Sequence, residues 1–470
     1  MGTINSAFSL IAQALDAEQA GLNTVANNVA NANTPGYTQE VPNWQEKSPV
    51  AINGVVYGDG VGETGASSLR DRVLEQRLNQ QQQLAAASGS RLTALDSMQA
   101  VFTPASGSGG SSAGNIGTDL TSFFNSFSSL EANPSSNPLR QQVLSTASTL
   151  AGDISNAAAS LGAQRSALDQ QAASVASQVN ALTANLAQLN QQIQSTSPNG
   201  DAGTLEDQRQ QDLSKLSQLI GVNEVTTENN GLSITTASGQ LLVSEGQSIQ
   251  LTTGAVGGTT HFFVGGTDVT AQLATGGGSL GGLLTARDQD IPGALASLDQ
   301  LAYSVSTQVN TVNNAGTDLA GDNGNAGNIF AAQATVAGSA LGMKVAMTDP
   351  NHIAAAGLGK GTGDNSNAVA LAGLATQSTV GGQTPANYYS SFVTQLGTTV
   401  SSVETEHTAQ SASVTQLQTQ NSALSGVNLN DEASAMTTLE RSYQAASQVF
   451  AMLNTIMASA LNLGEQSTVS

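Results

Sequence analysis

The chain has 470 residues, and its 34 Asp and Glu residues outnumber its 13 Lys and Arg residues, which gives a formal charge of −21. This excess of negative charge disfavours nucleic acid and anionic membrane surfaces as binding partners. The absence of cysteine excludes disulfides, thiolate metal sites and a cysteine nucleophile. Aromatic residues make up only 4% of the chain, so we expect several modest domains built on Ala, Leu and Val instead of one large core.

The sequence shows neither a membrane span nor a cleavable export signal. No stretch approaches the roughly 18 apolar residues that a membrane span needs. The first basic residue is Lys47, so the positively charged start of a secretory signal is also missing. We therefore expect a protein that either stays in the cytoplasm or leaves the cell by a route that reads an uncleaved terminus.

Residues 4 to 32 carry apolar or small side chains at alternating spacings of four and three, which is the pattern of a coiled-coil helix. Residues 436 to 460 repeat this pattern at the other end of the chain. Two helices of matching length can share one apolar stripe, so we predict that they pair. The large members of this stripe, termed the terminal seam, are Ile4, Phe8, Ile11, Leu15, Leu22, Val25, Val29, Met436, Leu439, Tyr443, Phe450, Leu453 and Met457.

An ordinary amphipathic helix packed on a globular body would show the same spacing, but the low charge of these helices favours a role in assembly. Within residues 1–39 only Asp16 and Glu18 are charged, so the faces outside the seam can contact further copies of the chain without desolvating charge. Ala residues and Glu18 at seam positions make an isolated helix pair marginal. We expect the segments 1–40 and 425–470 to be mobile in the monomer and to fold on assembly.

A third heptad pattern runs from Leu168 to Ile193, and a second helical pattern follows from Leu205 to Ile220. The turn-forming residues Ser197 to Gly200 separate them. Together these segments predict a helical hairpin in the middle of the chain.

After residue 221 the period of the apolar residues changes from that of a helix to that of a strand. Short apolar runs predict strands at 222–225, 232–235, 241–243, 249–251 and 262–264. The glycine-rich run 276–282 leads back to helical patterns at 291–312 and 388–424, and the segments 106–117 and 321–327 predict loops. The predicted fold is therefore mainly α with an inserted β-rich domain: paired terminal coiled-coil helices, a helical-bundle body over 41–221 and 276–424, and a small β-rich domain over 222–275.

Residues that could carry chemistry do not fall into a recognised pattern. The acidic loop with Asp318 and Asp322 lacks the register of a calcium-binding loop, and the glycine-rich run 357–363 fails both phosphate-loop templates. The three histidines lie far apart in the sequence and have no metal-ligand spacing; they are His261, His352 and His407. We expect no catalytic residue, no metal and no cofactor.

Two segments, one near each end, resemble the terminal signatures of the bacterial flagellar rod, hook and hook-associated axial proteins. The first spans Ala26 to Thr38, and the second spans Ser425 to Glu432 and is followed by Tyr443 to Ala445. Gln39 stands where the family often has Arg. The signature residues are Asn27, Asn28, Asn31, Pro35, Gly36, Tyr37, Gly426, Val427, Asn428, Leu429, Tyr443, Gln444 and Ala445.

Both signatures make physical sense as helix ends. Pro35 bars continuation of the first helix, and Gly36 permits a positive φ. The segment Gly426 to Asn428 is predicted to be the hinge and cap that start the C-terminal helix. Asp431 and Glu432 would lie in its first turn, where acids complement the helix dipole.

The middle of the chain separates the members of this family. The segments Leu205–Arg209, Gly278–Leu284 and Leu298–Ala302 resemble the members that form the junction between hook and filament. Rod and hook proteins lack the long helical hairpin that we predict over residues 168–220.

The resemblance implies a structural protein of the extracellular flagellum, exported unfolded by the flagellar type III apparatus without a cleaved signal. It implies a ring of subunits whose terminal helices line the axial core. The implied partners are further copies of the chain, the hook protein, a second junction protein and an export chaperone on the C-terminal segment. Neither nucleic acid nor a membrane is among them.

Two alternatives stay open. A hook or distal rod subunit would share both terminal signatures but should lack the helical hairpin. A secreted enzyme on a flagellar scaffold, such as a cell-wall hydrolase, would need an acidic pair in a cleft of the β-rich domain. The acids of that segment are Glu224, Glu228, Glu245 and Asp268.

Overall fold

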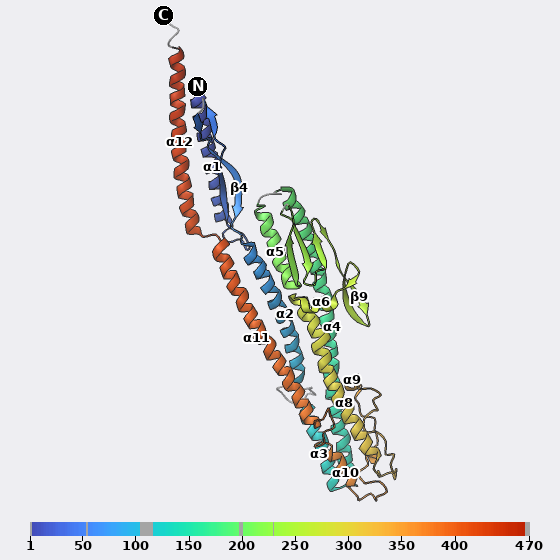
Figure 1. Ribbon diagram of the computed structural model, residues 1–470. Coiled ribbons are helices and arrows are strands. Elements are labelled where there is room, and N and C mark those ends of the chain that lie inside the picture. The colour runs from blue at the N-terminus through green and yellow to red at the C-terminus, as the bar shows by residue number, and fades with distance from the viewer. Residues whose placement is uncertain (1, 53–54, 104–115, 197–200, 229, 466–470) are drawn as a thin grey trace. The chain divides into compact units, whose positions relative to one another are not determined.

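The computed structural model describes residues 2–52, 55–103, 116–196, 201–228 and 230–465, and it confirms a mainly α fold with small β sheets (Figure 1). The chain forms two compact units. The first unit comprises Met1–Gln82, Val179–Leu251 and Ser411–Ser470, and the second comprises Gln83–Gln178 and Thr252–Gln410. The predicted β-rich segment 222–275 therefore contributes to both units, and its folding as a separate domain stays a prediction.

Helices and strands follow one another in groups along the chain. The helices are α1 (Gly2–Asn31), α2 (Arg72–Phe102), α3 (Ile116–Ala132), α4 (Asn137–Thr196), α5 (Thr204–Leu219), α6 (Thr270–Gly276), α7 (Gly278–Thr285), α8 (Ile291–Asn314), α9 (Ser339–Gly342), α10 (Ser366–Gly373), α11 (Pro385–Ser425) and α12 (Leu429–Glu465). A π-helical turn spans Ala286–Asp290, and a 3₁₀ turn spans Pro350–His352. The strands are β1 (Glu40–Glu46), β2 (Val50–Ile52), β3 (Val55–Tyr57), β4 (Val61–Ser68), β5 (Val222–Thr226), β6 (Leu232–Thr236), β7 (Leu241–Ser244), β8 (Gln247–Ser248), β9 (Leu251–Val256), β10 (Thr259–Val264) and β11 (Thr267–Asp268).

The helices that the apolar periodicity predicts are present in the structure. α1 and α12 contain the predicted terminal helices, and α5, α8 and α11 begin and end within a few residues of their predicted bounds. α4 extends beyond the heptad pattern at both ends. Among the helices that the structure describes, we find none that combines the length and the apolarity needed to cross a membrane.

Four strands lie between α1 and α2, in a segment that we predicted to belong to a mainly helical body. β1 pairs antiparallel with β4, and β2 pairs antiparallel with β3. Val and Gly residues are frequent here, and such residues disfavour helix. The register of the β1–β4 pair shifts between Pro42 and Trp44, as expected where a Pro cannot donate a hydrogen bond to the ladder. β1 and β4 both contact α1.

In the first unit, β5, β6, β7 and β8 form an antiparallel sheet beside α4. Side chains of β6 alternate in burial, with Leu232 and Ile234 inside, which is typical of a strand with one covered face. The buried Asn190 of α4 donates to the backbone carbonyl oxygens of Leu232 (2.7 Å) and Glu245 (3.2 Å). These hydrogen bonds fix the sheet against α4.

The strand predictions hold for most of this region. The strands at 222–225, 232–235, 241–243 and 262–264 are confirmed, whereas the strand at 249–251 is wrong, because β8 ends at Ser248 and β9 begins at Leu251. The predicted turn at 197–200 and residue 229 lie outside the described residues.

A glycine-rich segment forms helix where the sequence predicted a connection. The pattern placed the return to helix at Ile291, but α6 and α7 already occupy residues 270–276 and 278–285. Gly282 gives the reason, because a Cβ there would overlap with the carbonyl oxygen of Ala87 in α2. The low helix propensity of Gly is thus overridden by a close packing of backbones that a larger residue would prevent.

The core of the second unit gathers aromatic side chains from α3 and from the segment after α8. The ring centroid of Phe123 lies 5.2 Å from that of Phe127 and 5.5 Å from that of Phe330. All three side chains are fully buried. The predicted loop 321–327 carries an isolated bridge and is otherwise irregular. Residues 106–115 of the other predicted loop lie outside the described residues, and its last two residues, 116 and 117, already belong to α3.

Two carboxyl groups meet between α3 and α4 in the second unit. Asp153 is 1% exposed, and one oxygen of Asp119 and one of Asp153 are buried without a hydrogen-bond donor among the described residues. Burial, and then the neighbouring Asp153, raise the pKa of Asp119 from 3.8 to about 7. Because the folded-state pKa of Asp119 exceeds its unfolded value, the protonated Asp119 carboxyl stabilises the fold at acidic pH, and this stabilisation is lost as the pH rises through about 7.

We predict that Asp119→Asn raises the free energy of unfolding at pH 8 by on the order of 1 kcal/mol and changes it little at pH 5. The amide mimics the protonated carboxyl, so it removes the penalty that ionisation imposes at high pH. Denaturant unfolding of the full chain at both pH values measures the effect. The exposed Asp96 of α2 supplies the control, since Asp96→Asn should change neither value, and equal destabilisation by Asp119→Asn at both pH values would contradict the prediction.

Candidate functional site

The terminal helices α1 and α12 lie side by side in the first unit (Figure 1). The rings of Phe8 and Phe450 meet edge to face, with centroids 5.3 Å apart and planes at 90°. Farther along, a Cβ on the buried Gly21 would lie 3.2 Å from Leu439 and 3.1 Å from Trp44. The small residue lets α1, α12 and β1 approach closely, so the predicted pairing of the termini is observed.

Most of the terminal seam lies in this contact, but its side chains differ in burial. Val25 and Leu439 are buried, at 4% and 9% exposure. Phe8, Ile11, Leu15, Leu22, Met436, Phe450, Leu453 and Met457 are half-buried. The side chain of Ile4 lies outside the described residues.

Two seam residues lie outside the contact between the helices. Val29 is 40% exposed and Tyr443 is 36% exposed. A straight α-helix drifts by about 20° per heptad relative to a strict seven-residue repeat, so the inward position near the end of α1 falls to Asn28 instead of Val29. An apolar residue at a heptad position was therefore not enough to place every side chain.

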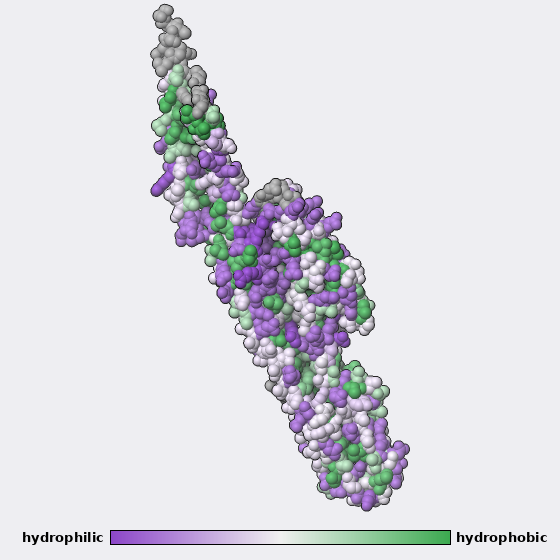
Figure 2. All heavy atoms as spheres, in the orientation of Figure 1, coloured by the Kyte–Doolittle hydropathy of each residue, from purple (hydrophilic) through white to green (hydrophobic). Residues whose placement is uncertain are grey.

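α12 carries a second line of apolar side chains, which the helix pair leaves uncovered. Val449, Met452 and Ile456 follow one another at spacings of three and four and are 37%, 58% and 54% exposed. We term these three residues the outer stripe. Figure 2 shows apolar side chains gathered on the visible face of the terminal helices. A helix with two apolar lines can contact α1 with one and a further element with the other.

Asn28, a residue of the N-terminal signature, is 1% exposed and has all four of its hydrogen-bonding positions filled. Its Nδ2 donates to the backbone oxygen of Glu40 (2.8 Å) and to Oε1 of Glu432 (3.0 Å). Its Oδ1 accepts from the hydroxyl of Tyr37 (2.8 Å) and from the backbone N–H of Glu40 (3.0 Å). One side chain therefore joins the end of α1, the start of β1 and the start of α12.

Glu432 receives a second donor from Gln39. The Gln39 Nε2 lies 2.7 Å from Oε1 of Glu432, and the Gln39 backbone N–H donates to the carbonyl oxygen of Ser425 (2.8 Å). Glu432 is 3% exposed, so these donors replace its lost hydration. We expected Glu432 only to complement the helix dipole, and its role as an acceptor at this junction could not be read from its position in the sequence.

The turn after α1 brings the signature residues against α5. Gly36 has a φ of +77°, as predicted, and a Cβ there would lie 2.7 Å from Nε2 of Gln211. That same Nε2 donates to the carbonyl oxygen of Pro35 (3.0 Å), and the Thr38 N–H donates to Asp207 (3.1 Å). Glycine is thus required both by the backbone angle and by the approach of α5.

Burial, followed by the charges of Glu40, Asp207 and Glu432, raises the pKa of Tyr37 well above its ordinary value of 10. The phenol therefore stays protonated and keeps donating to Asn28. The remaining N-terminal signature residues support the same turn: Asn31 donates to Asn27 Oδ1 at 2.9 Å.

The C-terminal signature is confirmed as a helix cap. α11 ends at Ser425, and the Asn428 side chain accepts the backbone N–H of Asn430 at the start of α12 (3.1 Å). Gly426 and Val427 are half-buried in the connection between the two helices. The other signature residues are exposed; they are Leu429, Tyr443, Gln444 and Ala445.

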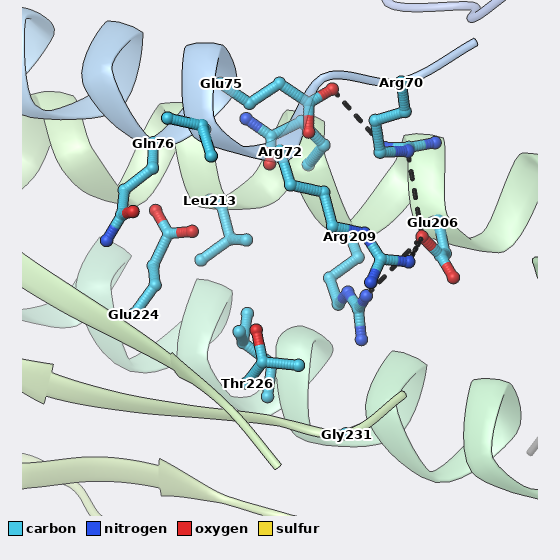
Figure 3. Close-up of a pocket in the computed structure, with 13 residues that line it drawn as sticks. Arg70, Arg72, Glu75, Gln76, Glu206, Arg209, Leu213, Glu224, Thr226 and Gly231 are labelled. Atoms are coloured by element: carbon cyan, nitrogen blue, oxygen red, sulfur yellow. Dashed lines mark hydrogen bonds and ion pairs between the residues drawn. The ribbon is translucent and has the colours of Figure 1, made fainter. Parts of the chain in front are cut away.

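A cluster of charges, buried except for the half-exposed Arg72, lies next to this turn and lines a cavity of about 230 Å³ (Figure 3). Arg70 lies 2.6 Å from Asp207 and 3.6 Å from Glu75, and Arg72 lies 3.0 Å from Glu206. Figure 3 shows the guanidinium groups directed toward Glu206, which is 1% exposed. Burial raises the pKa of Glu75 to about 7, although Arg70 opposes the rise. The charges pair with one another, and we interpret the cluster as the clamp that fixes the segment before α2 to α5.

Potential ligands of a metal ion gather at one place in the described part of the chain, namely Asp318, Asp322 and His352 of the second unit. Two of the acids that a hydrolase would need in the β-rich segment interact with other side chains. Glu224 accepts from Asn79 (2.8 Å), and Asp268 pairs with His261 (2.6 Å).

Comparisons with known proteins point to one family. Residues 108–330 match the family model of the flagellar hook-associated protein FlgK helical domain, and residues 12–38 match that of the flagella basal body rod protein. The chain is 26% identical to flagellar hook-associated protein 1 of Escherichia coli K12, over 98% of this chain and 99% of that protein. It is 25% identical to the protein of the same name from Bacillus subtilis 168, over 96% of each.

A solved structure shares the fold. The flagellar hook junction protein FlgK from Burkholderia pseudomallei superimposes with a TM-score of 0.64 at 20% sequence identity. The match covers 73% of this chain and 99% of that one.

We predict that Asn28→Ala loosens the junction between the termini. The substitution removes one of the two donors to Glu432, the acceptor of the Tyr37 hydroxyl and both side-chain hydrogen bonds to the Glu40 backbone, and the local opening free energy should fall by about 1–3 kcal/mol. Amide hydrogen exchange at Gln39 and Glu40 should then accelerate about ten- to a hundredfold, read by mass spectrometry of the full chain. The exposed Asn33 gives a control of the same residue type, and unchanged exchange in Asn28→Ala would show that the junction does not depend on this side chain.

Proposed function

We infer that this chain, a member of the flagellar hook-associated protein 1 family, is a structural protein of the bacterial flagellum and forms the junction between hook and filament. The observation that carries this function is the match to relatives of that name over nearly the whole of both chains. Asn28 joins the two ends of the chain through Glu432, Tyr37 donates to Asn28, and Asn428 caps the start of α12, as a subunit built around a terminal helix pair requires.

We propose that assembly covers the outer stripe of α12. Val449, Met452 and Ile456 are more exposed than the seam residues that face α1. Charge is scarce around them, because residues 442–464 of α12 include no charged side chain. A neighbouring copy of the chain can therefore cover the stripe without desolvating charge. A ring of copies arranged in this way would meet the hook protein on one side and a second junction protein on the other.

We propose that the terminal helices become fully ordered only in the assembly. Eight of the large seam side chains are half-buried in the single chain, so each contributes less than the roughly 1.5–3 kcal/mol of a fully buried one. An export chaperone on the C-terminal segment would cover the same apolar residues before assembly. Hydrogen exchange of the purified monomer tests the proposal: amides of residues 5–25 should exchange rapidly, and strong protection throughout 4–32 would overturn it.

We infer that the protein has no catalytic activity and lies outside the cell as part of the flagellum. The nearest alternative is a hook or distal rod subunit. The described residues of α4 and α5 form the helical elements that this alternative lacks, and the match of residues 108–330 to a hook-associated helical domain supports the junction.

Deletion of the gene tests the function directly. The junction role predicts cells with hooks but no filaments, seen by electron microscopy, and flagellin lost to the medium. Cells without hooks would move the protein to the rod or hook, and intact flagella would contradict any axial role.

Complementation of the deletion with variants tests the outer stripe. We predict that Met452→Glu fails to restore filaments although the monomer folds normally, because the new charge would be desolvated only against a neighbouring subunit. Leu22→Asp and Leu453→Asp should fail as well, but they also disturb the contact within the chain. Val369→Glu, an equally drastic change at an exposed apolar residue of α10, serves as the control and should restore filaments. Normal filaments with Met452→Glu would exclude the outer stripe as a subunit contact.

A further inference from the structure

Three side chains that have no role in the terminal helix pair meet in the second unit. Nδ1 of His352 lies 2.7 Å from a carboxylate oxygen of Asp318 and 3.5 Å from one of Asp322. A ligand atom from each of the three residues lies within 4.8 Å of the other two. We propose that Asp318, Asp322 and His352 form a binding site for a divalent transition-metal ion, with Zn²⁺ as the ion that fits best.

The donor atoms are those that Zn²⁺ takes in proteins. Zn²⁺ binds imidazole nitrogen and carboxylate oxygen at about 2.0–2.2 Å in a tetrahedral arrangement, and two ligands of such a tetrahedron lie about 3.3 Å apart. The two observed separations, 2.7 and 3.5 Å, lie on either side of this value. Displacements of the ligand atoms by a few tenths of an ångström would therefore bring all three groups around one ion, with water as the fourth ligand.

The backbone holds the two segments that carry these ligands in register. Thr317 forms bridges with Asn323 and with Ala356, on either side of the cluster. The N–H of Leu319 donates to the carbonyl oxygen of Asn351 (3.0 Å). The ligands thus come from two loops that backbone hydrogen bonds hold together. This lowers the entropy cost of bringing the ligands around one ion.

Burial and charge favour a cation at this place. The Asp318 side chain is fully buried, whereas those of His352 and Asp322 are 38% and 53% exposed. An ion can therefore enter from solvent and reach a buried carboxylate. Asp349 adds negative charge to the site, and Arg140 adds one positive charge. With a neutral imidazole these groups leave an excess of negative charge, which a dication would neutralise.

A protonated histidine bridging two acids is the competing explanation of the same geometry. The chain offers a comparison, because His261 lies 2.6 Å from Asp268 on β10 and β11. That pair is an ordinary His–Asp contact with a single carboxylate. Asp322, the second carboxylate, is what distinguishes the site at His352, and its contribution to metal binding is what the titration measures.

The proposal departs from our expectation that the chain has no metal site. The spacing of the histidines and the register of the acidic loop each excluded a metal when taken alone. The fold brings the two features together across 34 residues of sequence. In a chain without cysteine, a bound metal is a cross-link that can join two loops where a disulfide cannot.

Calorimetric titration of the untagged full chain with Zn²⁺, after dialysis against a chelator, tests the proposal. The wild-type chain should bind one equivalent, and its thermal unfolding midpoint should rise with Zn²⁺ and fall back with chelator. Asp322→Asn should weaken binding at least about tenfold while leaving the metal-free unfolding midpoint unchanged, because this side chain is half exposed. His261→Gln is the matched control and should bind Zn²⁺ as the wild type does.

A second measurement does not depend on the variants. X-ray absorption of the Zn²⁺-loaded chain should report one imidazole in a shell of otherwise oxygen ligands. Failure of the wild type to bind Zn²⁺, equal affinity of wild type and Asp322→Asn, or a loss of affinity in His261→Gln would each overturn the site.

Discussion

The buried amide of Asn28, with a partner for each of its four hydrogen-bonding positions, holds the first unit together at the point where both chain ends meet. It bonds to β1 on one side and to Glu432 of α12 on the other. A buried amide with an unfilled position would be costly, and a filled one is specific because each partner must stand at a fixed angle. The direction in which α12 leaves the body, and hence its register on α1, depends on this junction.

From that junction the two helices run outward with little charge and with apolar contacts that are incomplete in the single chain. Val25 and Leu439, near the junction, are buried, while Phe8, Phe450 and Met457 farther out are half-buried. Stability therefore declines toward the chain ends, as local unfolding in proteins follows the density of buried contacts. This gradient suits the subunit that we propose, which is exported before it assembles: it has a fixed base and ends that gain their packing from other copies.

The spacing of apolar residues was sufficient to predict the helices that have one apolar face. α1, α5, α8, α11 and α12 could be predicted because one face of each is apolar. The signature turn could be predicted because Pro fixes φ and Gly permits a positive φ. The strands β1 to β4 were missed because the alternation of their apolar and polar residues is weak, and because the pairing of β1 with β4 joins residues up to 28 positions apart. α7 was missed because Gly282 is required by the close approach of Ala87. This contact is distant in sequence, so local helix propensity does not describe it. Glu432, Gln39 and the cluster at His352 were missed for the same reason: their partners are distant in sequence.

The measurement that tests the account most directly is maleimide labelling of Met452→Cys, the single thiol in a chain that has none. The outer stripe is exposed in the single chain and, in our account, covered by a neighbour in the flagellum. The purified monomer should label fully and rapidly. Intact flagella should label slowly, and labelling should become complete only after they are dissociated at acidic pH or with denaturant. Equally rapid labelling of monomer and intact flagella would contradict the account.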